Sequence, residues 1–320
     1  MDANIQTNDW LANEMKPRIS YFGQFGILIG LIGVGAILAG LIQLGILITI
    51  TDLKILMSGN SDKLIEVMAL PQNTNKVMLM QVLGTLVMMA VPAFVFAKIV
   101  AKQPVQYLGF SNKINYLQIL LVVAIAFIGL FLSGGLGELN KLIPLSNSLK
   151  LRFEKLEQDY EKQVMIFANM KTFGDYFLSM IMIAILPAIF EELLFRGALQ
   201  KLLIDWFKTP HIAILVTSII FSLVHFSFYG FLPRMMLGMV LGYLYFYGKS
   251  IWLNILMHFI NNGVAITAMF LAIRNNKSAT ETMKAGFPIW VLIIVLPAMI
   301  GLLFIYKKVS EKKQLNNVMI

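Results

Sequence analysis

The chain has 320 residues, of which 58% are hydrophobic and 13% charged, and its mean hydropathy is +0.76. Soluble domains carry about 25% charged residues, so this composition excludes an ordinary soluble protein and predicts a polytopic membrane protein. The formal charge of +9 comes from Lys and Arg in connections and tails rather than from a basic domain, which argues against nucleic-acid binding. The absence of cysteine excludes disulfides, thiolate metal sites and a cysteine nucleophile.

The first part of the chain predicts a polar segment followed by three transmembrane helices. Residues 1–26 lack the short apolar region of a cleavable signal, so the first apolar segment is expected to remain as a span. Apolar stretches of about 20 residues are long enough to cross the hydrocarbon core. Within residues 27–133, three such stretches predict spans at about 27–50, 77–99 and 114–132.

Residues 134–172 are too polar to cross a membrane. Apolar side chains nevertheless recur there at steps of three and four residues, at Leu149, Phe153, Leu156, Tyr160, Val164 and Phe167. This period predicts an amphipathic helix that lies on the membrane surface or against the bundle, with its Glu and Lys residues forming a solvated face.

The rest of the chain predicts five more spans. Four fall within residues 173–273, at about 173–203, 212–229, 231–247 and 251–273, and one falls within residues 274–320, at about 289–306. The sequence therefore predicts an all-α fold, a polytopic transmembrane helical bundle of about eight spans with one amphipathic helix outside the membrane.

The charge pattern predicts the orientation of the bundle. Four lysines, Lys307, Lys308, Lys312 and Lys313, directly follow the last span, which predicts a cytoplasmic C-terminus, and eight spans then place the N-terminus on the same side. Arg274, Lys277 and Lys284 would lie outside, against the rule. The Lys-, Asn- and Ile-rich composition is typical of bacteria, so we expect an integral protein of a bacterial cytoplasmic membrane.

Three charged residues interrupt the fourth span. Glu191, Glu192 and Arg196 stand inside an apolar run, although each charge at the bilayer centre costs at least about 2.5–3.5 kcal/mol. On a helix, Glu192 and Arg196 are four residues apart with the acid first, which favours an ion pair of structural importance. Glu191 points about 100° away from them and has no partner nearby in sequence, so it is available for chemistry.

Polar residues also interrupt later spans. His225 follows an apolar run in the fifth, His258 and Asn262 share one face of the seventh, and Arg234 lies near one end of the sixth, where its side chain can reach the membrane interface. Taken singly, the histidines could be packing residues or interhelical hydrogen-bonding groups. A free carboxylate, two imidazoles and an amide on three spans together predict a polar pocket.

Two chemistries fit such a pocket. In one, Glu191 is a general base and His225 helps to hold a water, while His258 and Asn262 donate to the oxyanion of a hydrolysed amide. In the other, Glu191, His225 and His258 bind a divalent metal such as zinc. The metal option takes Glu191 away from the role of base and lacks a His-Glu-x-x-His helix, so the residues favour activated water without an obligatory metal. No Gly-x-Ser-x-Gly sequence supports a serine site.

The three motifs, Glu191-Glu192-x-x-x-Arg196, Phe221-x-x-x-His225 and His258-x-x-x-Asn262, occur in this order on successive spans. Together they resemble the signature motifs of the CPBP family. That family includes the type II CAAX prenyl endopeptidases and bacterial bacteriocin-processing or immunity proteins. The resemblance covers about residues 173–272, and all six motif positions are intact.

The resemblance implies an intramembrane endopeptidase in which Glu191 is the catalytic base and His225 its partner on the water. His258 and Asn262 would form the oxyanion hole, with Glu192 and Arg196 supporting the site. The family includes members described as metalloproteases, so the resemblance leaves the metal open. The expected partners are the lipid bilayer and a peptide or membrane-protein substrate. Two other functions fit the residues: a proton- or ion-coupled transporter, and a non-catalytic immunity protein that binds a peptide.

Overall fold

The computed structural model describes residues 19–168 and 170–318, and helices make up 82% of the chain, with no strand among the described residues. The all-α fold expected from the sequence is therefore confirmed. Several helices begin where their sequences provide a cap. Asn115 and Gln118 form a capping box at the start of one helix, Thr172 and Asp175 form another, and the Ser20 hydroxyl accepts from the Gly23 amide at a third.

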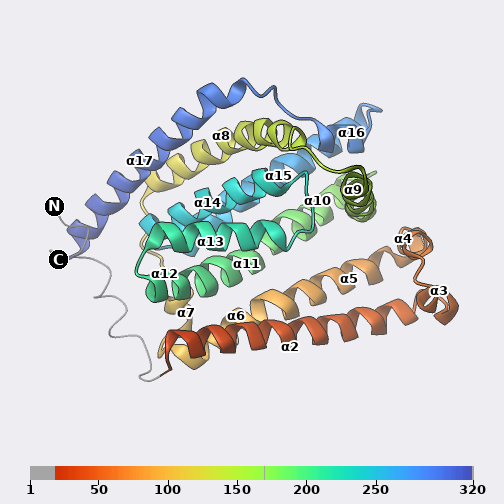
Figure 1. The fold of residues 1–320 in the computed structure, drawn as a ribbon, viewed down its shortest axis with the longest axis horizontal. Helices are drawn as coiled ribbons and strands as arrows, with labels where there is room; N and C mark the ends of the chain where they lie inside the picture. The colour runs from red at the N-terminus through yellow and green to blue at the C-terminus, as the bar shows by residue number, and fades with distance from the viewer. Residues whose placement is uncertain (1–18, 169, 319–320) are drawn as a thin grey trace.

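The N-terminal helices form a long hairpin that leans against the remaining bundle (Figure 1). Its first arm is α2 and its second arm is continuous from a 3₁₀ turn through α6, with a π-helical segment between α5 and α6. Two short helices, α3 and α4, connect the arms. The bounds are α2 Tyr21–Ile48, α3 Leu53–Met57, α4 Ser61–Met68, η1 Pro71–Asn73, α5 Thr74–Thr85, η2 Leu86–Ala90 and α6 Val91–Val100.

The second group of helices packs around α8. This helix contacts α14, α15 and α17, and apolar side chains such as Val122, Ile125 and Met257 fill the space between them. α13 and α14 lie along each other. The bounds are α7 Pro104–Tyr107, α8 Tyr116–Lys141, α13 Pro210–Leu223, α14 Phe231–Gly248, α15 Ile251–Arg274, α16 Ala279–Lys284 and α17 Val291–Val318.

One long helical element, residues 173–207, lies between the hairpin and the second group. It consists of five segments, two of them π-helical: α10 Phe173–Ser179, η3 Met180–Ile185, α11 Leu186–Glu192, η4 Leu193–Gln200 and α12 Lys201–Phe207. The η3 segment contacts α15, and η4 contacts α6, α13 and α14. Single π turns inside α-helices occur frequently at functional sites. Here they flank the segment that contains Glu191 and Glu192.

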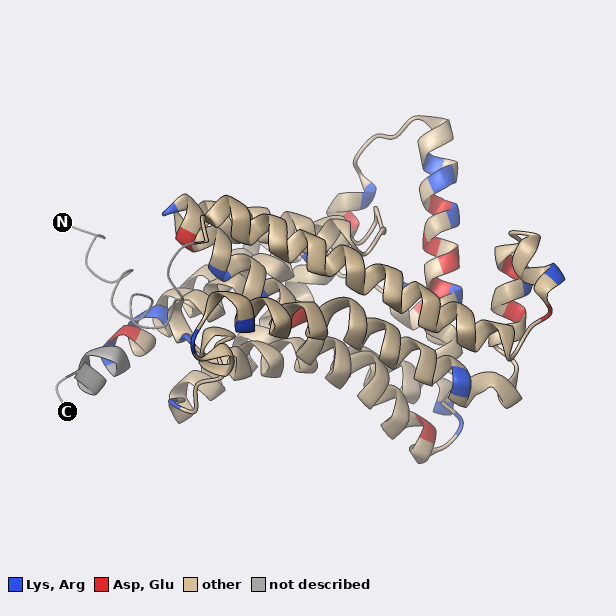
Figure 2. Ribbon diagram, turned by 90° about the horizontal axis from the view of Figure 1, so that it is seen from below, with Lys and Arg blue, Asp and Glu red and all other residues tan. Residues whose placement is uncertain are grey.

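The expected amphipathic helix is present as α9, Asn147–Phe167. It runs across the end of the bundle, and its interspersed acidic and basic residues contrast with the largely uncharged helices beside it (Figure 2). Its contacts to the bundle are few and specific. The ring of Phe153 stacks on Phe228 with centroids 4.7 Å apart, and Glu157 accepts a hydrogen bond from Ser227 at 2.7 Å.

In the described part of the chain, six helices are long and apolar enough to cross a membrane: Tyr21–Ile48, Pro71–Val100, Tyr116–Lys141, Phe173–Phe207, Ile251–Arg274 and Val291–Lys312. The other two expected spans correspond to α13 and α14, which are shorter. α13 ends at Leu223 rather than near residue 229, so its 14 residues extend only about 21 Å against a core of about 30 Å. The chain turns at residues 224–230 because Phe226 adopts a left-handed conformation, φ +50°.

The third span also differs from its expected end. α8 continues to Lys141 instead of ending near residue 132, so the first residues of the polar stretch 134–172 complete a membrane helix. The polar side chain of Asn140 is buried there. Its amide donates to the Phe228 carbonyl at 2.8 Å, and its oxygen accepts from the Leu232 amide at 3.1 Å. A polar residue at this end of α8 therefore fixes the loop between α13 and α14.

Candidate active site

The ion pair expected between Glu192 and Arg196 lies in the centre of the bundle. Arg196 Nη1 donates to Glu192 Oε1 at 2.9 Å, and both side chains are 0% exposed. Arg196 Nη2 donates to the Gly238 carbonyl at 3.1 Å, and the guanidinium lies over the Phe221 ring, 4.8 Å from its centroid. The pair therefore links the long helical element to α13 and α14.

Glu192 also makes contacts across to α15. Its Oε1 lies 2.9 Å from His258 Nδ1, and Asn254 Nδ2 lies 3.3 Å from Oε2. The same Asn254 amide group donates to the Leu241 carbonyl at 2.6 Å, and the side chain is fully buried. Asn254 was not expected from the sequence. The available signal was its position one helical turn before His258, on the face that also carries Asn262.

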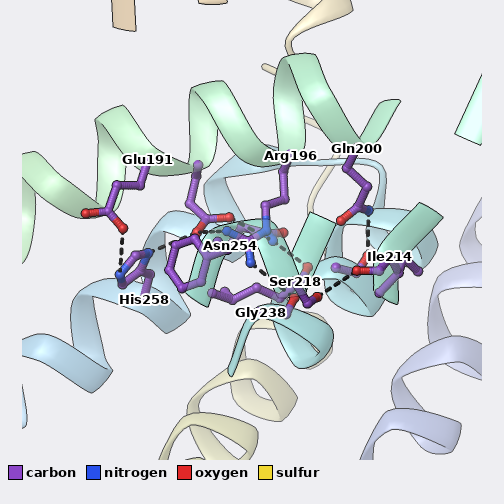
Figure 3. A network of polar contacts seen from close by, with 12 residues as sticks. Glu191, Arg196, Gln200, Ile214, Ser218, Gly238, Asn254 and His258 are labelled. Carbon is purple, nitrogen blue, oxygen red and sulfur yellow. Dashed lines mark hydrogen bonds and ion pairs between the residues drawn. The ribbon is translucent and has the colours of Figure 1, made fainter. Parts of the chain in front are cut away.

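Glycines in α14 allow this network to form. Gln200, one turn after Arg196, donates to the Gly242 carbonyl at 3.0 Å, so two successive polar side chains bind backbone oxygens of α14 (Figure 3). A Cβ atom added at Gly238 would lie 3.0 Å from the Cβ of Ser218. The small residue therefore lets α14 approach closely enough for its carbonyl to reach the guanidinium.

His225 is presented by the loop that follows α13. Its Nδ1 lies 2.7 Å from the Phe221 carbonyl, four residues earlier, so the imidazole caps the end of the helix. The next residue, Phe226, is 79% exposed and holds the left-handed backbone conformation that turns the chain away. An aromatic residue in that conformation is strained, and such strain accumulates at functional sites.

Glu191 faces both imidazoles. Its Oε2 lies 3.8 Å from His258 Nε2 and 4.0 Å from His225 Nε2, and Figure 3 shows Glu191 and His258 pointing toward each other. The structure therefore brings together three of the four side chains that the sequence placed in one pocket. The Glu191 side chain is 12% exposed and that of His225 24% exposed, whereas Glu192 behind them is fully enclosed.

Hydrogen bonds fix the orientation of both rings. The Phe221 carbonyl can only accept, so Nδ1 of His225 carries a proton. Glu192 is paired with arginine and also accepts, so Nδ1 of His258 carries a proton as well. Each ring therefore presents to Glu191 an Nε2 that donates only when the imidazole is charged. Glu191 Oε2 is buried and has no hydrogen-bond partner. Three acceptors thus converge on a space that requires a donor.

Asn262 lies one turn beyond His258 on α15. Its amide is 3.4 Å from the Ile183 carbonyl, and its oxygen is 3.3 Å from the Asn261 amide. These contacts hold it against η3, the segment that leads into α11. It therefore borders the site, while its described hydrogen bonds go to residues outside the three-acceptor space.

No group of three or more His, Asp or Glu side chains in the described part of the chain is spaced as a metal site. The donor chemistry nevertheless suits a divalent cation, since Glu191 Oε2 is unpartnered and His258 has the carboxylate contact typical of metal-binding histidines. A cation here would be held by Glu191, His225 and His258.

These features define a helical integral membrane protein with an acid–base cluster inside the helical bundle. Residues 173–264 match the model of a protease family described as Rce1-like, type II CAAX prenyl endopeptidase. This match confirms the resemblance drawn from the three motifs over the segment that carries them, and it indicates a protease. Searches of the curated proteins and of the solved structures found no significant match.

Replacing Arg196 by Met should destabilise the protein by about 3–5 kcal/mol, because it leaves the carboxylate of Glu192 buried without its cation. Thermal unfolding in detergent measures the loss. Replacing Glu192 by Gln as well should recover part of it, since no uncompensated charge then remains. Arg152→Met, at an exposed position on α9, is the matched control. Equal stability of Arg196→Met and Arg152→Met would contradict a structural role for the pair.

Proposed function

We propose that the protein is an intramembrane endopeptidase that hydrolyses peptide bonds of membrane-associated or peptide substrates with a water activated by Glu191 and His225. The observation that carries the proposal is the convergence of Glu191 Oε2 and the two Nε2 atoms on a partly exposed space without a donor. A water molecule satisfies such a space because it donates two hydrogen bonds and offers its oxygen lone pairs for attack.

Each residue has a role that follows from its contacts. Glu191, the carboxylate without a fixed partner, takes the proton of the attacking water. His225 holds the water through Nε2. His258 donates to the oxyanion once its ring is charged, because only then does Nε2 carry a proton. Asn262, on the same helical face, supplies the second donor through its side-chain amide. Glu192 keeps the His258 ring in position, and Arg196 cancels the charge of Glu192.

A divalent cation is the alternative partner for the three acceptor atoms, because it can bind their lone pairs. Bound by Glu191, His225 and His258, it would supply Lewis-acid chemistry to a coordinated water. We favour the metal-free form because Glu191, as the base, must be free to accept a proton, which a ligand to zinc is not. In this form Glu191 and His258 share the proton taken from water while the oxyanion persists, and that proton then passes to the leaving amine nitrogen as the C–N bond breaks.

Two rival functions use the same residues. In a proton- or ion-coupled transporter, Glu191 and the histidines would lie on a path across the membrane. In a non-catalytic immunity protein they would line a peptide-binding surface. Glu192 and Arg196, on the buried side of the cluster, are fully enclosed and bound to each other. They therefore offer neither an open path for an ion nor an exposed surface for a peptide.

Glu191→Gln should abolish proteolysis, because the amide keeps the shape of the carboxylate but cannot accept the proton. New peptide termini in membranes of cells that make the native protein, compared with cells that make Glu191→Gln, measure this directly. Glu154→Gln, on the solvated helix α9, is the matched control and should give the native set of termini.

Identical termini from native protein and Glu191→Gln, with both folded and equally abundant, would refute the endopeptidase. Loss of ion flux in Glu191→Gln would then favour the transporter. Unchanged protection of cells against a bacteriocin would favour the peptide-binding protein.

Chelation should leave hydrolysis essentially intact, because Glu191 can take the proton from water without a cation. The measurement is the rate of appearance of the Glu191-dependent termini in membranes before and after treatment with EDTA and 1,10-phenanthroline. A loss of at least about tenfold that added zinc restores would show instead that the three acceptors hold a metal.

We further propose that both termini are cytoplasmic. The tail of α17 lies at the same end of the bundle as the connection after α6, the end of α12 and the turn after α14, where lysines predominate. The opposite end, with α3, α4 and α9, carries acidic and basic residues together (Figure 2). In this orientation the loop that carries His225, which contacts α9, lies toward the non-cytoplasmic face.

Because the chain contains no cysteine, single introduced cysteines report this orientation cleanly. In intact spheroplasts, a membrane-impermeant maleimide should label Lys155→Cys on α9 and should leave Lys312→Cys on α17 unlabelled until the membrane is broken. Both positions are exposed. The reverse labelling pattern would show that the termini lie outside.

A further inference from the structure

The first turn of α14 contains another arginine, Arg234. It follows directly on the loop 224–230, which holds His225. A positive charge at a helix N-terminus is repelled by the helix dipole, so this position does not stabilise the arginine. The charge of Arg234 therefore needs another source of stabilisation, which a bound anion would provide.

The described contacts of Arg234 do not neutralise it. The guanidinium carbon lies 5.3 Å from the centroid of the Tyr160 ring on α9. Nη1 is buried and has no hydrogen-bond partner, and no ion pair joins Arg234 to a described carboxylate. Glu157, which reaches the same loop from α9, accepts instead from the Ser227 hydroxyl at 2.7 Å. A cation with a buried donor and no acceptor is therefore held at the edge of the cluster.

The backbone is built to hold the guanidinium in this place. A Cβ atom added at Gly230 would clash with Arg234 Nη1 and would lie 2.9 Å from Ser227 Oγ, so the arginine side chain folds back over a glycine toward the loop. Asn140 binds the loop at the Phe228 carbonyl and the first turn of α14 at the Leu232 amide. Asn140 therefore joins the loop and the first turn of α14, which carries Arg234, into one hydrogen-bonded unit.

This unit also contains the imidazole that faces Glu191. Arg234 is close enough for its charge to act on His225. A ligand that bound the guanidinium would thus be held beside the three-acceptor space, on the side covered by α9. A guanidinium matches the two oxygens of a carboxylate, with two parallel N–H···O bonds.

We propose that Arg234 binds a carboxylate of the peptide substrate, either its C-terminal carboxylate or an Asp or Glu side chain next to the cleaved bond. This inference rests on the proposed peptidase function and names the substrate feature that the site selects. Because Asn140 binds both the loop that carries His225 and the turn that carries Arg234, binding of the carboxylate sets which peptide bond lies against the activated water.

Three acetylated tripeptides test the proposal on the full-length protein in nanodiscs. Acetyl-Val-Ala-Ile with a free C-terminal carboxylate, its C-terminal amide, and acetyl-Val-Asp-Ile amide differ only in the presence and position of one carboxylate. Binding is measured by titration calorimetry with the Glu191→Gln variant, which prevents turnover. A hydrogen-bonded charge contributes enough that at least one acidic peptide should bind about tenfold or more tightly than the neutral amide.

Arg234→Gln should remove this preference by weakening the acidic peptide and leaving the neutral one unchanged. Arg274→Gln is the matched control, because Arg274 is also held against an aromatic ring, with its guanidinium 5.1 Å from the Phe173 centroid, and it should keep the preference. Arg234→Lys retains the charge without the planar fork and should show an intermediate preference, which separates recognition from a folding defect. The two acidic peptides distinguish a C-terminal carboxylate from a side chain.

Equal binding of acidic and neutral peptides, no binding of any, or a preference that survives Arg234→Gln would overturn the inference. If Glu191-dependent termini are still found, the peptidase function stands without it. If carboxylate binding depends on Arg234 but no Glu191-dependent termini appear, the peptidase function fails and the anion site remains.

Discussion

The arrangement of the site depends on one buried ion pair. A carboxylate and a guanidinium enclosed among apolar helices are stable only when they neutralise each other and their remaining donors and acceptors are bound. Glu192 and Arg196 neutralise each other and have further partners on two elements: the carbonyl of Gly238 on α14, and the side chains of Asn254 and His258 on α15. Among the described contacts, Arg196 Nε is the one buried donor of the pair that has no hydrogen-bond partner. These contacts connect α15, which carries His258, to the helical element 173–207, which carries both glutamates.

The pair also determines which charges remain free. Since Arg196 cancels Glu192, the neighbouring carboxylate of Glu191 is the negative charge that nothing in the network compensates. In a medium of low dielectric constant a carboxylate without a partner is stabilised by a water or a cation. The Nε2 atoms of His225 and His258 lie within 4.0 Å of Glu191 Oε2 and can bind the same water or cation. Adjacent glutamates thus receive opposite environments from a single turn of helix, one enclosed and paired, the other partly exposed.

Much of this could be predicted from the sequence, and the exceptions have physical causes. The i,i+4 spacing was sufficient to predict the pair of Glu192 and Arg196, because both partners lie on one helix. The link between Glu192 and His258 crosses 66 residues of chain and depends on how closely α15 approaches, which no local pattern encodes. Asn254 was missed for the same reason. The end of α13 was misplaced because Phe226 adopts a conformation that an aromatic residue rarely takes, and apolar content alone extended the span through the turn.

The position of the cluster helps to decide between a transport path and a site for a chemical reaction. A transport path needs polar groups that continue through the bundle and exchange partners as the cargo moves. Here the polar groups beyond Glu191 are Glu192, Arg196 and Gln200, which are buried and bound either to each other or to carbonyls of α14. A species that reached Glu191 from the exposed side would meet the buried ion pair and the hydrogen bonds to α14 on the other side. A site that is closed on one side is suited to holding a water and a peptide bond in place, because the groups that surround the reacting atoms do not have to move.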